Sequence, residues 1–289
     1  METILVVAYI AMGLRLILVG SERIFLKYLE EYDSISVSAL FFIVASITLL
    51  PIFFVVDISS IPSSINELGI GAISALIYSI GFYSYVKAIS EEDASLIAPL
   101  YSSSLLWLLI LGSIFLGEDV TILRILGSIT MFIGLFFLYS GGFKEKILAI
   151  KSSRASILMI IGSLFIALGR AVDTYAIRSI DERLYAWVIN FYIGMYMLIL
   201  TLVMGRKNTL IRIISENPKK MLLAGFTNGW GYLMLLIAII GLQVTVAEPA
   251  TLLSVFVTAF LAKRFLHENV EERIPGMIMM FIGAVLLFI

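Results

Sequence analysis

The sequence MFIG at residues 131–134 returns unchanged at residues 280–283, a shift of 149 residues. Just before it, FLGEDV at residues 115–120 returns as FLHENV at residues 265–270, a shift of 150 residues. Self-similarity at one fixed spacing is the signature of a duplicated unit. Because this spacing is about half of the 289 residues, the sequence predicts a protein built from two related halves.

Composition restricts the class of protein further. Hydrophobic residues make up 61% of the chain and charged residues only 14%, whereas a soluble domain is typically about half apolar and a quarter charged. One globular core cannot bury so much apolar surface, so we expect an integral membrane protein surrounded by lipid. The net charge of −1 offers no basic face to nucleic acid. The absence of cysteine excludes disulfides and thiolate metal sites.

Long apolar runs predict an all-α membrane protein, because a helix needs about 20 apolar residues to cross the hydrocarbon layer. The ten expected spans are residues 3–26, 35–56, 68–89, 94–116, 121–140, 155–177, 185–204, 221–240, 244–266 and 274–289.

These ten spans divide evenly between the two copies of the repeat. Residues 1–142 are expected to form the first five-helix repeat, 143–154 a linker, and 155–289 the second repeat. Because each repeat has an odd number of spans, the second starts from the opposite side of the membrane, and the repeats are inverted. Inverted repeats place a substrate site near the midplane and work by alternating access.

Basic residues predict the orientation of this arrangement. Fourteen lysines and arginines fall in the loops after spans 1, 3, 5, 7 and 9, whereas the opposite side carries only Arg124, Arg178 and Arg183. Basic loops tend to stay in the cytoplasm. The count therefore favours termini that lie outside the cytoplasm.

Two stretches at matching positions resemble a known family. Residues 93–101, Asp-Ala-Ser-Leu-Ile-Ala-Pro-Leu-Tyr, run on to Leu-Gly-Glu at 116–118, and resemble the fourth-helix signature of EamA-type permeases of the drug/metabolite transporter superfamily. Glu-Pro at 248–249 and Leu-His-Glu at 266–268 resemble its second copy, with His267 where the family has glycine.

This resemblance implies a ten-helix protein of the cytoplasmic membrane with a central cavity lined by helices 1, 3, 4, 6, 8 and 9. It also implies secondary transport, often export, of amino acids or other small metabolites. The family's termini are cytoplasmic, which is opposite to the orientation that the basic residues favour.

Charged residues within the expected spans are the first candidates for a transport site, since each costs about 2.5–3.5 kcal/mol to insert. Arg15 and Glu22 share a face of the first span, and Arg170 and Asp173 lie one turn apart in the sixth. Glu248 lies one turn inside the ninth. A cavity with both signs of charge suits a zwitterion, and Glu248 could couple transport to a proton gradient. The alternative for Arg170 and Asp173 is that they only neutralise each other.

Aromatic and amide side chains form the second group of candidates, as walls of an amphipathic cavity with groups that orient a substrate. They are Tyr78, Phe82, Tyr101, Trp107, Asn190, Asn228, Trp230 and Tyr232. Tyrosine and tryptophan also commonly pack between helices or anchor at the membrane interface. An amide in hydrocarbon needs hydrogen-bond partners, which favours a specific role for the two asparagines.

Glu118 and Glu268 stand where the fourth and ninth spans end, and we interpret both as turn or cap residues that tie spans 4–5 and 9–10. Glycines inside the spans are interpreted as sites of close helix contact. They are Gly71, Gly81, Gly127, Gly134, Gly231, Gly276 and Gly283.

An intramembrane enzyme is the alternative from another functional class. The single histidine, the lack of cysteine and the absence of HExxH, GxSxG and Walker A motifs count against it. We therefore expect a carrier without cofactor or metal, whose partners are a small-molecule substrate and membrane lipid, and which works as a monomer. A solute of another class, such as a sugar, a nucleoside or a hydrophobic amine, stays possible as the substrate.

Overall fold

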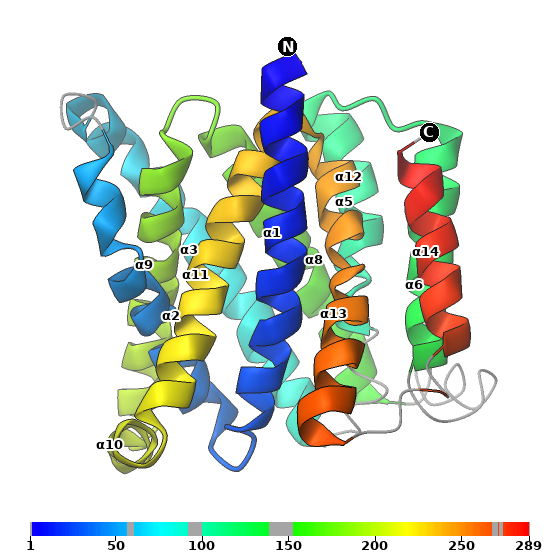
Figure 1. Cartoon of the computed structure of the whole chain (residues 1–289). Coiled ribbons are helices and arrows are strands. Elements are labelled where there is room, and N and C mark those ends of the chain that lie inside the picture. The colour runs from blue at the N-terminus through cyan, green and yellow to red at the C-terminus, as the bar shows by residue number, and fades with distance from the viewer. Residues whose placement is uncertain are drawn as a thin grey trace. The chain divides into compact units, whose positions relative to one another are not determined.

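The computed structural model describes residues 2–56, 61–91, 100–138, 153–267, 271 and 274–288, and every regular element in these ranges is a helix (Figure 1). The elements are α1 (Glu2–Lys27), α2 (Ser34–Thr48), η1 (Leu50–Phe54), α3 (Ile61–Glu91), α5 (Ser104–Leu111), η3 (Gly112–Leu116), α6 (Ile122–Leu138), α8 (Arg154–Ala176), α9 (Glu182–Val203), α10 (Lys207–Glu216), α11 (Pro218–Gly241), α12 (Val244–Thr251), α13 (Ser254–Leu261), η4 (Ala262–Leu266) and α14 (Ile274–Leu287).

Six helical segments are long and apolar enough to cross a membrane, which confirms the prediction of an all-α membrane protein. They are Glu2–Lys27, Ser34–Phe54, Arg154–Ala176, Glu182–Val203, Pro218–Gly241 and Val244–Phe265. Shorter apolar helices overlap the four other expected spans, at Gly69–Tyr85, Ser104–Leu116, Ile122–Phe137 and Ile274–Leu287. The arrangement of all ten as two inverted repeats stays a prediction.

Two local features differ from the predicted spans. The second span is α-helical only to Thr48 and continues as the short helix η1 around Pro51, because proline cannot donate to the α-helical ladder. The helix α10 has no counterpart among the predicted spans. Its ten residues include Lys207, Arg212 and Glu216, so it is too short and too polar to cross a bilayer.

The chain folds as two compact units, and α3 and α8 each contribute to both. Unit 1 comprises residues 1–79 and 172–242. In it, α11 packs along α1 and α2, and α2 also packs on α9. Figure 1 shows α1 (blue) and α11 (yellow) side by side. Glycines permit the close approach of α11 to α2, since a Cβ atom at Gly229 would lie 2.9 Å from the carbonyl oxygen of Ala45.

Unit 2 comprises residues 80–171 and 243–289. Its tightest crossing joins α6 to α14, which run side by side in Figure 1. A Cβ atom at Gly127 would lie 2.6 Å from the oxygen of Gly283, and one at Gly134 would lie 2.9 Å from the oxygen of Gly276. For these four glycines the prediction of close helix contacts is confirmed.

Elements at matching positions of the two sequence copies have matching local structure. Both α5 and α13 end in a short π-helical turn followed by one residue in the left-handed conformation, Gly117 with φ 69° and His267 with φ 55°. A side chain in this conformation is strained by about 1–2 kcal/mol. The second copy thus keeps the same chain path although histidine replaces glycine there.

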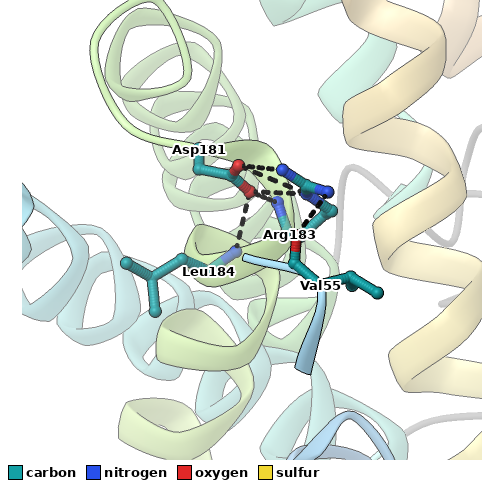
Figure 2. A network of polar contacts seen from close by, with 4 residues as sticks. All are labelled: Val55, Asp181, Arg183 and Leu184. Carbon is teal, nitrogen blue, oxygen red and sulfur yellow. Dashed lines mark hydrogen bonds and ion pairs between the residues drawn. The ribbon is translucent and has the colours of Figure 1, made fainter. Parts of the chain in front are cut away.

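In each copy, an aspartate also caps the N-terminus of the helix that forms the second span. The side chain of Asp33 accepts from the backbone N–H of Ser36 at the start of α2. That of Asp181 accepts from the N–H groups of Arg183 and Leu184 at the start of α9 (Figure 2). Arg183 also donates to the carbonyl oxygen of Val55, which fixes the start of α9 against the end of the second span.

Candidate functional site

The structure divides the candidate side chains between the two units. Unit 1 holds Arg15, Glu22, Tyr78, Asp173, Asn190, Asn228, Trp230 and Tyr232, and unit 2 holds Phe82, Tyr101, Trp107, Arg170 and Glu248.

Asp173 is the centre of the polar interior of unit 1, with 0% of its surface exposed. Its Oδ1 accepts hydrogen bonds from the hydroxyls of Ser74 at 2.7 Å and Tyr185 at 2.8 Å. Its Oδ2 accepts from those of Tyr78 at 2.7 Å and Tyr232 at 2.6 Å. We call these five residues the Asp173 cluster.

Four helices supply the cluster, so it depends on tertiary packing. Ser74 and Tyr78 lie one turn apart on α3 and therefore share a face. Asp173 lies in the last turn of α8, Tyr185 in the first turn of α9, and Tyr232 in the middle of α11. A carboxylate has about four acceptor positions, and burying one is costly unless they are filled. The four hydroxyls fill them.

Arg15 reaches the same part of unit 1 from α1. Its Nη1 donates to the carbonyl oxygen of Gly231 at 2.8 Å, one residue before Tyr232. Arg15 is buried, and Glu22, two turns further along α1, is partly buried. The helix crossing of α1 and α11 thus brings a guanidinium next to the backbone that carries one of the cluster's tyrosines.

The two asparagines of unit 1 bond to each other, as expected for amides within the membrane. The Nδ2 of Asn228 on α11 donates to the Oδ1 of Asn190 on α9 at 3.0 Å, and the Nδ2 of Asn190 donates to the carbonyl oxygen of Ala186 at 2.8 Å. Trp230 donates to the carbonyl oxygen of Thr48 at the end of α2, at 3.3 Å. The bond between the two asparagines joins α11 to α9, and the bond from Trp230 joins α11 to the end of α2.

The central feature of unit 2 is an ion pair between Arg170 on α8 and Glu248 on α12. Their side chains are 15% and 11% exposed, respectively. Sequence reasoning finds no partner for Glu248 on its own helix; the partner comes from α8. Asp173, one turn beyond Arg170, has its own hydroxyl partners in unit 1.

Aromatic and hydroxyl side chains lie elsewhere in unit 2. The indole Nε1 of Trp107 donates to the hydroxyl of Ser163 at 3.1 Å, and Ser163 bonds to the hydroxyl of Ser103 at 2.6 Å. The ring of Tyr101 packs against those of Phe82 and Tyr85, with centroids 6.5 and 5.0 Å away. Ser163 lies seven residues before Arg170, and so on the same face of α8.

Sequence reasoning misses two members of the Asp173 cluster. Ser74 could have been found, because it lies one turn before Tyr78 on the stripe that includes Phe82. Tyr185 gives no such signal, since its role depends on how α9 packs against α8. Among the described residues, no group of three histidine, cysteine, aspartate or glutamate side chains could hold a metal ion.

The chain has long apolar helices, and an acid and a base form a pair inside them. These two features are typical of an integral membrane protein with a polar interior. Residues 6–140, a little under half of the chain, match the model of the EamA-like transporter family. The family is part of the drug/metabolite transporter superfamily, as the sequence signatures predict, and its members are transporters. The match over residues 6–140 indicates a membrane transporter of this type.

The likeness to solved structures extends over the whole chain. A crystal structure described only as "Crystal structure of protein" has a TM-score of 0.63 with 11% identity, and covers 99% of this chain and 96% of that chain. At this identity the likeness shows the fold alone. No curated protein matches the sequence.

Proposed function

We propose that this protein is a secondary active transporter that exports small polar metabolites, above all amino acids, across the cytoplasmic membrane by alternating access. The observation that carries this proposal is the ion pair between Arg170 and Glu248. Charged side chains within a membrane span are costly and commonly mark a substrate or ion pathway.

The partners of this ion pair match the two ends of an amino acid. A guanidinium binds a carboxylate with paired hydrogen bonds, and a carboxylate binds an ammonium group. A zwitterion that enters between Arg170 and Glu248 replaces their contact with two contacts of the same kind. Without substrate, the two side chains neutralise each other and keep the charge of the site low. Both keep some exposure, 15% and 11%, which leaves an edge of the pair accessible.

The side chains around the pair support the same substrate class. Ser163 lies about 10 Å along α8 from Arg170, from a rise of 1.5 Å per residue over seven residues, and Trp107 on α5 donates to its hydroxyl. That distance suits the side chain of an amino acid whose charged backbone groups sit at the ion pair. Binding sites of this kind combine apolar walls with a few polar groups that fix orientation.

Alternating access draws support from the paired glycines. Gly127 and Gly134 in the first copy have Gly276 and Gly283 as partners in the second, at a shift of 149 residues. Each glycine of α6 lies against the repeat partner of the other one. This exchange of contacts is what a two-fold axis between inverted repeats produces. Inverted repeats support transport by rocking about a fixed site.

Solute counterflow in proteoliposomes tests the proposal. The purified protein is reconstituted with unlabelled amino acids inside, and uptake of radiolabelled amino acids is measured. Exchange of one or a few amino acids supports the function. No exchange by folded protein with any amino acid contradicts it and directs the search to sugars, nucleosides and hydrophobic amines.

A double variant separates substrate binding from a purely structural ion pair. Replacing a buried ion pair by apolar residues of similar size is often neutral or stabilising. Arg170→Met with Glu248→Leu should therefore fold but lose counterflow, because the substrate's two charged groups have no partners. Counterflow by this double variant at the wild-type rate would show that the pair serves only folding. Arg154→Met, at the exposed start of α8, is the control for the loss of one arginine.

An intramembrane enzyme draws less support from these contacts. An acid that shares or transfers a proton in catalysis must be able to change its protonation state. Glu248 lies against a guanidinium, which has no acceptor for the proton of a neutral carboxyl group.

A further inference from the structure

We propose that the Asp173 cluster is a proton-binding site that couples transport to the proton gradient. This inference rests on the proposed transport function and assigns the coupling step to a group other than the substrate-binding ion pair. The site is formed by one carboxylate and four hydroxyls, those of Ser74, Tyr78, Tyr185 and Tyr232.

The two buried acids have ligands of different chemical kinds. Glu248 contacts the guanidinium of Arg170, which can only donate hydrogen bonds. A hydroxyl can donate or accept. The hydroxyls around Asp173 donate to the ionised carboxylate, and after protonation one of them can rotate and accept from the new carboxyl O–H. The same four hydroxyls can therefore bond to Asp173 in both its ionised and its protonated form.

The charged and titratable groups around Asp173 come from several helices. Tyr78 on α3, Tyr185 on α9 and Tyr232 on α11 contact it directly. On its own helix, Arg170 lies one turn earlier and contacts Glu248. From α1, Arg15 bonds to the backbone of Gly231 beside Tyr232. In these contacts the two guanidiniums bond other groups, and the four hydrogen bonds described above to the Asp173 carboxylate come from hydroxyls.

Complete burial links proton uptake to movement. Asp173 and Tyr185 are 0% exposed, so a proton reaches the carboxylate only when the cluster opens. Protonation removes the negative charge that holds three tyrosines from three helices, and hydrogen bonds to a charged group are stronger than those between neutral groups. The proton therefore loosens the contacts among α3, α8, α9 and α11. A proton that binds more readily to the open form than to the closed form shifts the balance between them.

The test compares two modes of transport in the same proteoliposomes. Counterflow needs only substrate exchange, whereas accumulation driven by an imposed pH gradient needs proton coupling. For Asp173→Asn we expect pH-driven accumulation to be lost, and to fall by a much larger factor than counterflow does. Accumulation by Asp173→Asn at the wild-type level overturns the inference, as does wild-type transport that ignores the pH gradient. Absence of counterflow in the wild-type protein is a separate result and contradicts the proposed function instead.

A second variant keeps the inference testable if Asp173→Asn does not fold. Tyr232→Phe removes one donor to the carboxylate and leaves three. The ionised form is then less stabilised, so the pH for half-maximal pH-driven accumulation should move upward by about one unit. Tyr175→Phe is the matched control, because this tyrosine is exposed on the same helix as Asp173. An unchanged pH profile in Tyr232→Phe contradicts the inference.

Discussion

The carboxylate of Glu118 caps the helix that begins near Thr245, more than 120 residues further along the chain. Its Oε2 accepts from the backbone N–H of Thr245 at 3.0 Å and from the Thr245 hydroxyl at 2.6 Å. Its Oε1 accepts from the N–H of Val244 at 2.8 Å. The sequence-based interpretation of Glu118 as a cap is thus confirmed, but the helix that it caps is α12, and not the helix that follows it. Glu268 lies outside the described residues.

Removing this cap should destabilise the protein. The loss of a helix cap costs about 0.5–2 kcal/mol, and Glu118 satisfies two backbone donors and one hydroxyl. We expect Glu118→Ala to lower the unfolding temperature in detergent, and Glu118→Gln to lower it less, since an amide oxygen still accepts. Asp119→Asn, at the exposed neighbouring position, is the control. Equal unfolding temperatures for Glu118→Ala and the control would contradict a capping role.

Because α6 and α14 cross so closely, one added methyl group at the crossing should strongly destabilise the protein. A Cβ atom at Gly283 would lie 2.6 Å from the carbonyl oxygen of Gly127 and 2.8 Å from the backbone nitrogen of Met131. Since backbone must move to make room, Gly283→Ala should cost about 1–3 kcal/mol, as overpacked cores do.

The control for this substitution is a glycine with open space around it. Apart from its chain neighbours and the nearby backbone of its own helix, no atom lies within 4 Å of the Cβ position at Gly13, in the middle of α1. Gly13→Ala should therefore be neutral or stabilising by up to about 1 kcal/mol, because alanine favours the helix. Thermal unfolding of the two variants in the same detergent gives the comparison. A Gly283→Ala protein as stable as Gly13→Ala would show that the two helices can separate freely.

The cap of α9 predicts how stability depends on pH. Burial alone would raise the pKa of Asp181, but the hydrogen bonds from Arg183 and the attraction of its guanidinium outweigh burial and lower this pKa below its ordinary value (Figure 2). A carboxyl group whose pKa is lower in the folded state stabilises that state above its unfolded pKa. The stabilisation is lost as the pH falls through the folded pKa.

We therefore expect Asp181→Asn to lower the unfolding temperature most at neutral pH, and the difference from wild type to shrink below about pH 4. Glu182→Gln, which also removes one carboxyl group at the start of α9, is the control for the change in net charge. The measurement is the unfolding temperature of the three proteins between neutral pH and pH 3. A difference that stays constant down to the lowest pH would contradict the assigned role of Asp181.

The sequence predicts the class of fold because the relevant signals are local. Apolar runs of span length locate the helices, and the repeated motif at residues 131–134 and 280–283 locates the glycines of α6 and α14. Helix α10 is too short and too polar for the length criterion that finds spans. The second span is irregular because of Pro51, and the length criterion takes no account of proline.

The candidate site was only partly accessible to sequence reasoning, because its contacts join distant segments. Asp173, Tyr78 and Tyr232 were identified by type and position, but the bonds that unite them span 95 and 59 residues. The partner of Glu248 could not be read from helical spacing, since Arg170 belongs to another helix. Helical periodicity predicts which side chains share a face of one helix. It does not predict which faces meet.

The orientation of the protein can be decided by labelling, because the natural chain has no cysteine. One cysteine is introduced at Ser215 in α10 or at Ser179 between α8 and α9, both exposed. The lysine and arginine count places position 215 in the cytoplasm and position 179 outside, by the tendency of basic loops to stay inside. Whole cells treated with a membrane-impermeant maleimide should then label Ser179→Cys but not Ser215→Cys. Labelling of Ser215→Cys alone would establish the opposite orientation, with cytoplasmic termini, which the family resemblance implies.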